Sequence, residues 1–268
     1  MRSCPQSAAK DLTLNSMHFI YLSPHLDDVA LSCGGLVWEQ SHAGAPVEVW
    51  TICAGDPPEG PLSPFAQSLQ KRWQTGLQPS MQRRQEDLAS CQLLGAAAKH
   101  FPIPDCIYRQ AEPGGHFLYT TEESLTGPLD PAEQPLLQRL RYRLAAELPA
   151  SSTFVCPLAL GGHVDHRLVR QAAELLNRRL YYYADYPYIL QQPEALSNLL
   201  QEGWSAETYP ISPVAMAAWE DSVAAHISQV STFWSSLDEM RLAMLRYCQE
   251  QSGVSLYGSP QLLPSVDS

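Results

Sequence analysis

The sequence has no segment that would carry the chain into or across a membrane. The N-terminal stretch MRSCPQSAAKDLTLNSMHF is polar and lacks the apolar region of a secretory signal peptide. No uninterrupted apolar run is long enough to cross a bilayer. These absences predict a cytoplasmic protein without a membrane span.

Paired cysteines and positive charge are scarce as well. The chain has seven cysteines and no C-x-x-C pair, which excludes a cysteine-rich zinc knot and disfavours a disulfide framework. Lys and Arg number 17 against 28 Asp and Glu, for a formal net charge of −11. Nucleic acids and anionic membranes bind clustered positive charge, so we expect neither as a partner. A small neutral or cationic molecule fits better, and homo-oligomer formation stays open.

Two common catalytic signatures are also missing. The chain has no G-x-S-x-G sequence, the signature of a nucleophilic serine in an α/β-hydrolase. The first strand–helix turn lacks the glycines that cradle a phosphate in nucleotide-binding domains and carries His25, Asp27 and Asp28 instead. Neither a serine hydrolase nor a nucleotide-binding module is therefore indicated.

What the chain does contain is an alternation of apolar strands and helices. Residues 18–22 and 47–53 have the pattern of buried strands on either side of a helix at 29–40, and such a βαβ unit predicts a parallel sheet. Further strands are expected at 100–103, 154–158 and 180–183, and further helices at 81–95, 168–180 and 219–249. The helix at 81–95 is expected to bury Leu88 together with Cys91 and Leu94.

The domain organisation follows from length and composition. With 268 residues, 45% of them hydrophobic, and no internal repeat, residues 1–268 are expected to form a single domain. Residues 57–80 are rich in Pro, Gly, Ser and Gln and are either a lid over the substrate or a surface insertion. The tail at 253–268 is expected to be loosely ordered.

The most informative segment is Ser23-Pro24-His25-Leu26-Asp27-Asp28, which follows the first strand. Open α/β sheets bind their ligands at the carboxyl ends of their strands. His25 and Asp28, three positions apart in a turn that opens a helix, can point to one side and supply the imidazole and carboxylate that zinc or ferrous iron accepts. Asp27, next to a ligand without being one, is a candidate general base. The alternative is a simple helix N-cap.

A second polar segment, Gly161-Gly162-His163-Val164-Asp165-His166, follows another buried strand. His166 would complete a His, Asp, His set that leaves a coordination position open for water. His163 is a candidate for a protonated imidazole facing the developing oxyanion or the leaving nitrogen. Asp165 would hold His163 through its other ring nitrogen and favour its charged form. These residues together fill the roles that metal-assisted hydrolysis requires.

Other metal proteins fit less well. A metallo-β-lactamase-type hydrolase also uses H-x-D-H, but with another histidine two positions upstream, where this chain has Gly161. Structural zinc sites are closed by four protein ligands, and no fourth ligand is evident here. A non-catalytic zinc-containing binding protein is the alternative from a different class, and the missing fourth ligand, together with a candidate base and acid, favours an enzyme over it.

With these motifs the chain resembles the PIG-L/LmbE-like family of N-acetylglucosaminyl deacetylases. The matching residues, in the order of the family's motifs, are Pro24 to Asp28, Gly34-Gly35, Arg83 and Glu86, Leu94-Gly95, Pro104-Asp105, His163 to His166, and Ser228-Gln229. Two positions depart from the family pattern without removing a catalytic group: Leu26 stands where proline is common, and Cys106 where glycine usually follows Pro-Asp.

The resemblance implies a Rossmann-like α/β fold, a three-layer sandwich with a mostly parallel central sheet. It implies a single zinc ion, with Fe²⁺ as the alternative, held by residues that match His25, Asp28 and His166. Asp27 would be the general base, and His163 the general acid or oxyanion stabiliser. The activity implied is removal of an acetyl group from an N-acylated sugar or a related small molecule. Cleavage of a larger sugar-linked amide is the alternative.

Four further residues are candidates for substrate binding. Arg83 matches a family position whose guanidinium reaches substrate oxygens, although an ion pair with a neighbouring carboxylate of its own helix is an equal alternative. Asp56 and Asp105 stand at strand ends near the expected cleft, where they either bind substrate or terminate the strands. Asp185, in the tyrosine-rich run at 181–188, would accept hydrogen bonds from substrate hydroxyls.

Overall fold

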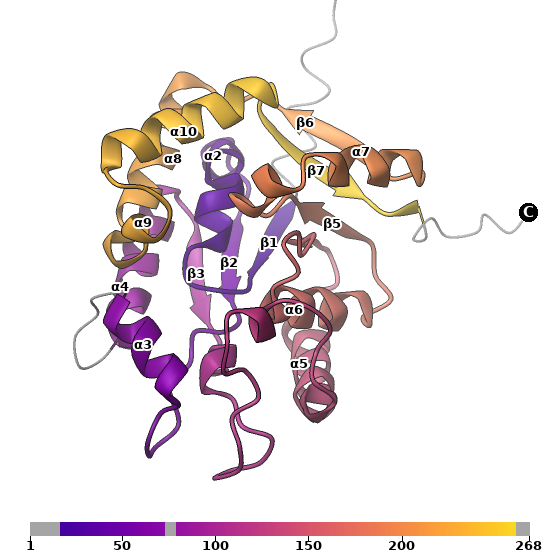
Figure 1. The fold of residues 1–268 in the computed structure, drawn as a ribbon. Coiled ribbons are helices and arrows are strands. Elements are labelled where there is room, and N and C mark those ends of the chain that lie inside the picture. Colours follow the sequence, from indigo (N-terminus) through magenta and orange to yellow (C-terminus); the bar gives the residue numbers. More distant parts are fainter. Residues whose placement is uncertain (1–16, 73–78, 261–268) are drawn as a thin grey trace, which may run out of the picture.

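A seven-stranded sheet with the strand order β3-β2-β1-β4-β5-β7-β6 forms the centre of the molecule (Figure 1). The structure, a computed structural model, describes residues 17–72 and 79–260. Its strands are β1 (His18–Ser23), β2 (Val47–Thr51), β3 (Ala97–His100), β4 (Ser152–Pro157), β5 (Leu180–Tyr183), β6 (Ser205–Tyr209) and β7 (Val254–Gly258). Its α-helices are α2 (Asp28–His42), α3 (Pro64–Arg72), α4 (Pro79–Leu93), α5 (Gln134–Glu147), α6 (Val164–Glu174), α7 (Glu194–Gln201), α8 (Pro213–Ala224), α9 (Ile227–Phe233) and α10 (Leu237–Glu250). The short 3₁₀ helices are η1 (Cys106–Tyr108), η2 (Glu123–Leu125), η3 (Pro131–Glu133) and η4 (Tyr188–Gln191).

The first five strands of this order run parallel, and β7 is antiparallel to both of its neighbours. Helices α5 and α6 cover one face of the sheet, and α2, α4, α8 and α10 the other (Figure 1). This confirms the expected α/β sandwich with a mostly parallel sheet. The chain leaves β1 toward β2 and later returns to β4 on the opposite side of β1. That reversal of strand order between β1 and β4 is where open α/β sheets bind their ligands.

The central strands are apolar on both faces because helices cover both sides. In β1, Ile20, Tyr21 and Leu22 are completely buried, and in β4 Val155 and Cys156 are equally inaccessible. Backbone pairing fixes the register, with Tyr21 opposite Val155. The two strands therefore end side by side, and the polar segments that follow them enter the same space.

Helix α2 carries the Gly34-Gly35 pair where it packs against α8. A Cβ atom added at Gly34 would lie 2.6 Å from Cδ1 of Trp219, and one at Gly35 would lie 2.8 Å from Cε3 of the same ring. Trp219 is fully buried, and its indole N–H donates to the Ala30 carbonyl oxygen of α2. Glycine is needed here because only a bare backbone lets the tryptophan approach the helix that begins at the polar turn after β1.

Several expected boundaries are wrong. Residues 254–258 form β7 inside the sheet instead of a loose tail, and residues 261–268 lie outside the described residues. The segment at 57–80 contains α3, while its residues 73–78 are not among those described. The expected helix at 219–249 is divided into α8, α9 and α10, with one break at Ser235-Ser236 as expected.

Other elements are displaced along the chain. The third strand occupies 97–100 and ends where 100–103 was expected to begin, and α6 starts at Val164, inside the second polar segment. On α4, Leu88 is 42% exposed, because the helix turns Arg83 and Asp87 inward instead. Among the described residues, no helix is both long and apolar enough to cross a membrane.

Candidate active site

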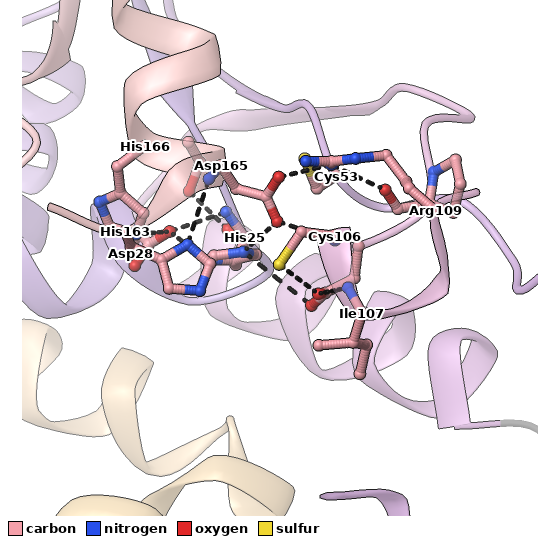
Figure 2. A network of polar contacts seen from close by, with 12 residues as sticks. His25, Asp28, Cys53, Cys106, Ile107, Arg109, His163, Asp165 and His166 are labelled. Carbon is pink, nitrogen blue, oxygen red and sulfur yellow. Dashed lines mark hydrogen bonds and ion pairs between the residues drawn. The ribbon is translucent and has the colours of Figure 1, made fainter. Parts of the chain in front are cut away.

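The two polar segments meet at the carboxyl ends of β1 and β4. The ring centroids of His25 and His163 are 4.8 Å apart, and those of His25 and His166 5.3 Å apart. Figure 2 shows the three imidazoles grouped on one side of Asp165, with Asp28 among them. Residues separated by 140 positions in the chain are thus brought into contact, as the strand-end argument predicts.

Asp28 lies between two of these imidazoles. Its Oδ2 is 3.2 Å from Nδ1 of His25 and 3.3 Å from Nε2 of His166, and it also accepts a hydrogen bond of 2.7 Å from the His25 backbone N–H. Burial disfavours its charged form, but the charges of His166 and His25 outweigh burial and hold the pKa of Asp28 well below its usual range. The carboxylate is therefore ionised and faces both rings at once.

The His166 ring is held from behind by Asp185. Nδ1 of His166 is 2.6 Å from Oδ1 of Asp185, whose other oxygen accepts the Leu160 backbone N–H at 2.9 Å. Nε2 of His166 is buried and has no hydrogen-bond partner within the described residues, although Asp28 is near. A buried nitrogen of this kind, turned toward a carboxylate and backed by a second one, suits a metal ligand.

His25 has the same arrangement with a different carboxylate. Its Nε2 is 3.0 Å from Oδ2 of Asp165, so that Nδ1 is the nitrogen that faces Asp28. Asp165 also accepts the backbone N–H of Cys106 at 3.0 Å and an N–H of Arg109. The expectation that the Asp165 carboxylate holds His163 is corrected by this contact with His25.

His163 is the N-cap residue of α6. Its Nδ1 accepts a hydrogen bond of 3.2 Å from the backbone N–H of Asp165, which leaves the ring proton on Nε2. Burial, followed by the charge of His25, lowers the pKa of His163 to about 3. The expectation of a protonated His163 is thus corrected, because the ring is a neutral N–H donor.

Asp27 is next to the imidazole cluster and does not act as a helix cap. The residue is 6% exposed, and its side chain makes no capping hydrogen bond to α2. Arg83 approaches from α4, with Nη2 3.8 Å from Oδ2 of Asp27. Burial and the charge of Asp28 raise the pKa of Asp27 to about 7, against the opposing charge of Arg83. A carboxyl group with a pKa near neutrality can both take up and release a proton.

A cavity of about 170 Å³ opens beside these groups. Its lining includes six residues of the predicted site, namely His25, Asp27, Asp28, Arg83, Asp105 and His163. The remaining lining residues are Leu69, Arg72, Ile107, Glu122, Leu125, Tyr188, Gln229, Thr232 and Phe233. Arg72 of α3 and Glu122 form an exposed ion pair of 2.9 Å at this cavity, so α3 and the loop before η2 meet there. The helix inside the segment 57–80 therefore contributes directly to the site.

The expected substrate-binding residues separate into three groups. Arg83 and Asp105 line the cavity, and Oδ2 of Asp105 is 3.9 Å from Nε2 of His25. Asp56 lies outside this cavity, on the surface, where its 67% exposed side chain pairs with Arg84 at 3.0 Å. Asp185 is 1% exposed and bonded to His166, so it is placed to orient that ring and has no surface to offer a substrate.

Sequence reasoning missed several residues around the site. Arg109 and Glu133 lie behind Asp165, and Gln229 and Phe233 line the cavity, whereas Tyr188, which also lines it, belongs to the tyrosine-rich run at 181–188 that was expected to help decide substrate identity. Gln229 belongs to the Ser228-Gln229 pair that the family resemblance had singled out without a role. For Arg109 and Glu133, the chain offers no spacing signal, because Arg109 follows η1 and Glu133 ends η3, both far in sequence from either polar segment.

Helix α9 is attached to α4 beside the cavity. The Ser228 hydroxyl donates to Oε2 of Glu86 at 2.6 Å, and the Ser228 backbone N–H also points to this carboxylate. His226, two positions before Ser228, is buried, and neither of its ring nitrogens is hydrogen-bonded within the described residues. Burial lowers its pKa, and the charged groups that act on it are Asp87, Arg83, Glu86 and Asp28.

The donors converge in a way that fits a divalent cation. The described residues offer overlapping groups of donors within 4.8 Å of one another, namely His25 with His163 and His166, His25 with Asp105 and Asp165, and Cys106 with His163 and Asp165. Asp28 distinguishes the first region, because one of its carboxylate oxygens faces a ring nitrogen of both His25 and His166, at 3.2 and 3.3 Å. The Asp165 carboxylate is already bonded to Arg109, His25 and a backbone N–H. We therefore place the candidate metal site between His25, Asp28 and His166.

Comparisons with known proteins agree in family and fold. The family model described as GlcNAc-PI de-N-acetylase, PIG-L, matches residues 20–176. The 2'-N-acetylparomamine deacetylase of Niallia circulans is 30% identical over 203 residues, which cover 69% of this chain and 71% of that protein. The zinc-inhibited form of teicoplanin deacetylase Orf2 superposes with a TM-score of 0.75 at 24% identity, covering 94% of this chain and 100% of that one. A deacetylase–teicoplanin complex gives 0.71 at 26% identity, covering 90% and 97%.

Proposed function

This chain belongs to the PIG-L family, and on that premise we propose that it is a metal-dependent N-deacetylase that hydrolyses the amide of an N-acetylated amino sugar. The observation that carries the proposal is the position of Asp28 between His25 and His166, with Asp27 beside them on the wall of a cavity. This arrangement supplies three metal ligands and a carboxyl group that is not a ligand.

His25, Asp28 and His166 would hold zinc or ferrous iron. The bound cation would polarise the acyl carbonyl and make water a better nucleophile near neutral pH. Two imidazoles and one carboxylate leave part of the coordination sphere for water and substrate, as catalytic zinc sites do. Asp185 and Asp165 support the two rings through the nitrogens that do not face Asp28.

The remaining groups would move protons and stabilise charge. Asp27 takes a proton from the attacking water while the water oxygen bonds to the acyl carbon. The oxyanion that forms faces the Nε2–H of His163, a neutral donor whose orientation is fixed by its bond from the Asp165 backbone. The C–N bond then breaks, Asp27 returns the proton to the leaving nitrogen, and acetate and a free amine are released. Arg83, next to Asp27, is placed to bind a substrate oxygen.

An amino sugar is the substrate class that the observations favour. The Niallia circulans relative is named for 2'-N-acetylparomamine, and the cavity is small and lined by both carboxylates and arginines. Polar groups of this kind bind hydroxyls, and Tyr188 and Phe233 add aromatic surface for a sugar ring. A larger sugar-linked amide is the second candidate, because the family resemblance does not separate acetyl from longer acyl groups.

The test is amine release from a panel of N-acetylated amino sugars by metal-replete, chelated and reconstituted protein. We expect release to stop on chelation and to return with zinc or ferrous iron. Asp27→Asn is expected to lose nearly all turnover while keeping its metal, and Asp221→Asn, an exposed partner of Arg241, to behave as wild type.

Three outcomes would count against the proposal. Turnover that survives chelation would exclude a catalytic metal. An Asp27→Asn enzyme with wild-type turnover would remove the base. Stoichiometric metal without amine release from any acetylated or longer-chain amide would favour the non-catalytic alternative.

A further inference from the structure

A buried charged chain lies behind the candidate metal site, on the side away from the cavity. Arg109 donates from Nε and Nη2 to the two oxygens of Glu133 at 2.8 and 2.7 Å. Its third nitrogen, Nη1, donates to Oδ1 of Asp165 and to the Pro104 carbonyl oxygen at 3.3 Å. Figure 2 shows Arg109 reaching Asp165 from the side opposite the three imidazoles. Arg109, Glu133 and Asp165 are 5%, 2% and 0% exposed.

We propose that Arg109 and Glu133 are positioning residues that fix His25 as a metal ligand by clamping the carboxylate of Asp165. The proposal rests on the proposed function, because it assumes that His25 is a ligand. Asp165 bonds Nε2 of His25, so any rotation of the carboxylate turns the imidazole whose Nδ1 faces Asp28. We call Arg109, Glu133 and Asp165 the clamp; none of these three residues lines the cavity that contains Asp27 and Asp28.

The geometry requires arginine. A guanidinium has a rigid fork that can bond both oxygens of Glu133 and still present a nitrogen to Asp165, whereas an ammonium is a single point donor. Glu133 ends η3, immediately before α5, and so ties the fork to a helix that packs against α6. Asp165 lies in the first turn of α6. The clamp thus connects the position of His25 to the packing of these two helices.

The carboxylate that orients His166 is held differently from the carboxylate that orients His25. Asp185 is held by the Leu160 backbone N–H, a fixed dipole of the loop after β4. Asp165 also accepts a backbone N–H, that of Cys106 at 3.0 Å, but its other oxygen is held by the Arg109 side chain from a different segment of the chain. Since an outer carboxylate that orients a ligand typically alters metal affinity about ten- to a hundredfold when disturbed, the clamp should be visible in metal binding itself.

For Arg109→Met, an effect of charge alone and a loss of positioning would change the zinc affinity in opposite directions, so one measurement distinguishes them. Arg109→Met removes a positive charge close to the cation, so electrostatics alone would strengthen metal binding. Loss of the bond from Arg109 would instead let the Asp165 carboxylate rotate, and metal binding would become weaker. Arg109→Lys keeps the charge and loses the fork, so charge alone predicts unchanged affinity, whereas positioning predicts a loss.

The experiment is a competition titration of zinc against a chelator with purified full-length protein. We expect the dissociation constant to rise about tenfold or more in Arg109→Met and at least about threefold in Arg109→Lys. The double variant Arg109→Met/Glu133→Gln, in which the lost charges balance, should bind as weakly as Arg109→Met. The visible bands of the Co²⁺-loaded protein should shift in the same variants, because the direction of the His25 ligand changes.

A matched control separates positioning from loss of stability. Met244→Ala removes a fully buried side chain of α10, on the other face of the sheet, and should lower the thermal midpoint while leaving zinc affinity and the cobalt bands unchanged. If Arg109→Met fails to fold, Arg109→Lys decides the question alone. Wild-type affinity in Arg109→Lys, or equal or tighter binding in Arg109→Met, would overturn the proposal.

The same titration distinguishes this failure from failure of the proposed function. His166→Ala should lose zinc in every case if the metal site is where we place it. If wild type and His166→Ala bind zinc alike, the site itself is wrong. If His166→Ala loses zinc while the Arg109 variants bind it normally, only the clamp is wrong.

Discussion

Asp185→Asn is the substitution that separates a metal-orienting residue from a substrate-binding one. In the structure, Oδ1 of Asp185 bonds Nδ1 of His166 and Oδ2 accepts the Leu160 N–H. An asparagine has one oxygen for these two N–H groups and turns its NH₂ toward the other. One buried N–H is then left without an acceptor, which costs about 1–3 kcal/mol of unfolding free energy.

Metal binding should weaken as well, because a neutral amide is a poorer partner for His166 than a carboxylate. We expect the zinc dissociation constant to rise about ten- to a hundredfold, equivalent to about 1.4–2.8 kcal/mol. The assays are chelator competition and denaturant unfolding of the metal-free protein. Tyr21→Phe, which breaks a buried bond to Gln40 far from the site, should lose stability but keep zinc affinity. A raised KM with unchanged zinc affinity in Asp185→Asn would refute the reasoning.

Two more outcomes follow from the junction of α4 and α9. Burial lowers the pKa of His226, so at this residue the unfolded chain binds a proton more readily than the folded protein. The contribution of His226 to the free energy of unfolding should therefore be complete above a pH of about 6.5 and decrease as the pH drops below it. His226→Leu should reduce this dependence of stability on pH, as measured by denaturant unfolding across that range. Glu86→Gln should raise KM for the amino sugar, because Glu86 fixes the start of α9 through Ser228, and Glu239→Gln, which weakens a comparable bond at α10, should not. A slope that persists in His226→Leu, or equal KM values in the two glutamate variants, would contradict these expectations.

The strand-end argument predicted from sequence that the residues of the candidate metal site converge, because it needed only local information. His25, Asp28 and His166 each follow a recognisable apolar strand, and parallel strands bring such residues to one edge of the sheet. The parallel sheet followed from one βαβ unit in the same way. The order of the strands in the sheet did not follow from the sequence. The pairing of β4 with β5, which places Asp185 behind His166, could therefore not be predicted.

The residues that were missed or misplaced depend on long-range contacts. Arg109 bonds Glu133 and Asp165 across 24 and 56 positions, and no periodicity connects these segments. Leu88 was expected inside because helical spacing favours an apolar face, yet α4 lies beside the site and turns Arg83 toward Asp27. Function overrides the apolar pattern where a helix supplies a polar side chain to a cavity.

The most direct test of the account is the position of the metal in zinc-loaded protein, located by anomalous diffraction at the zinc edge. We predict one ion about 2.0–2.2 Å from a ring nitrogen of His25, an oxygen of Asp28 and Nε2 of His166, with no fourth protein ligand. An ion bound instead by Cys106, His163 and Asp165, or one enclosed by four protein donors, would contradict the account.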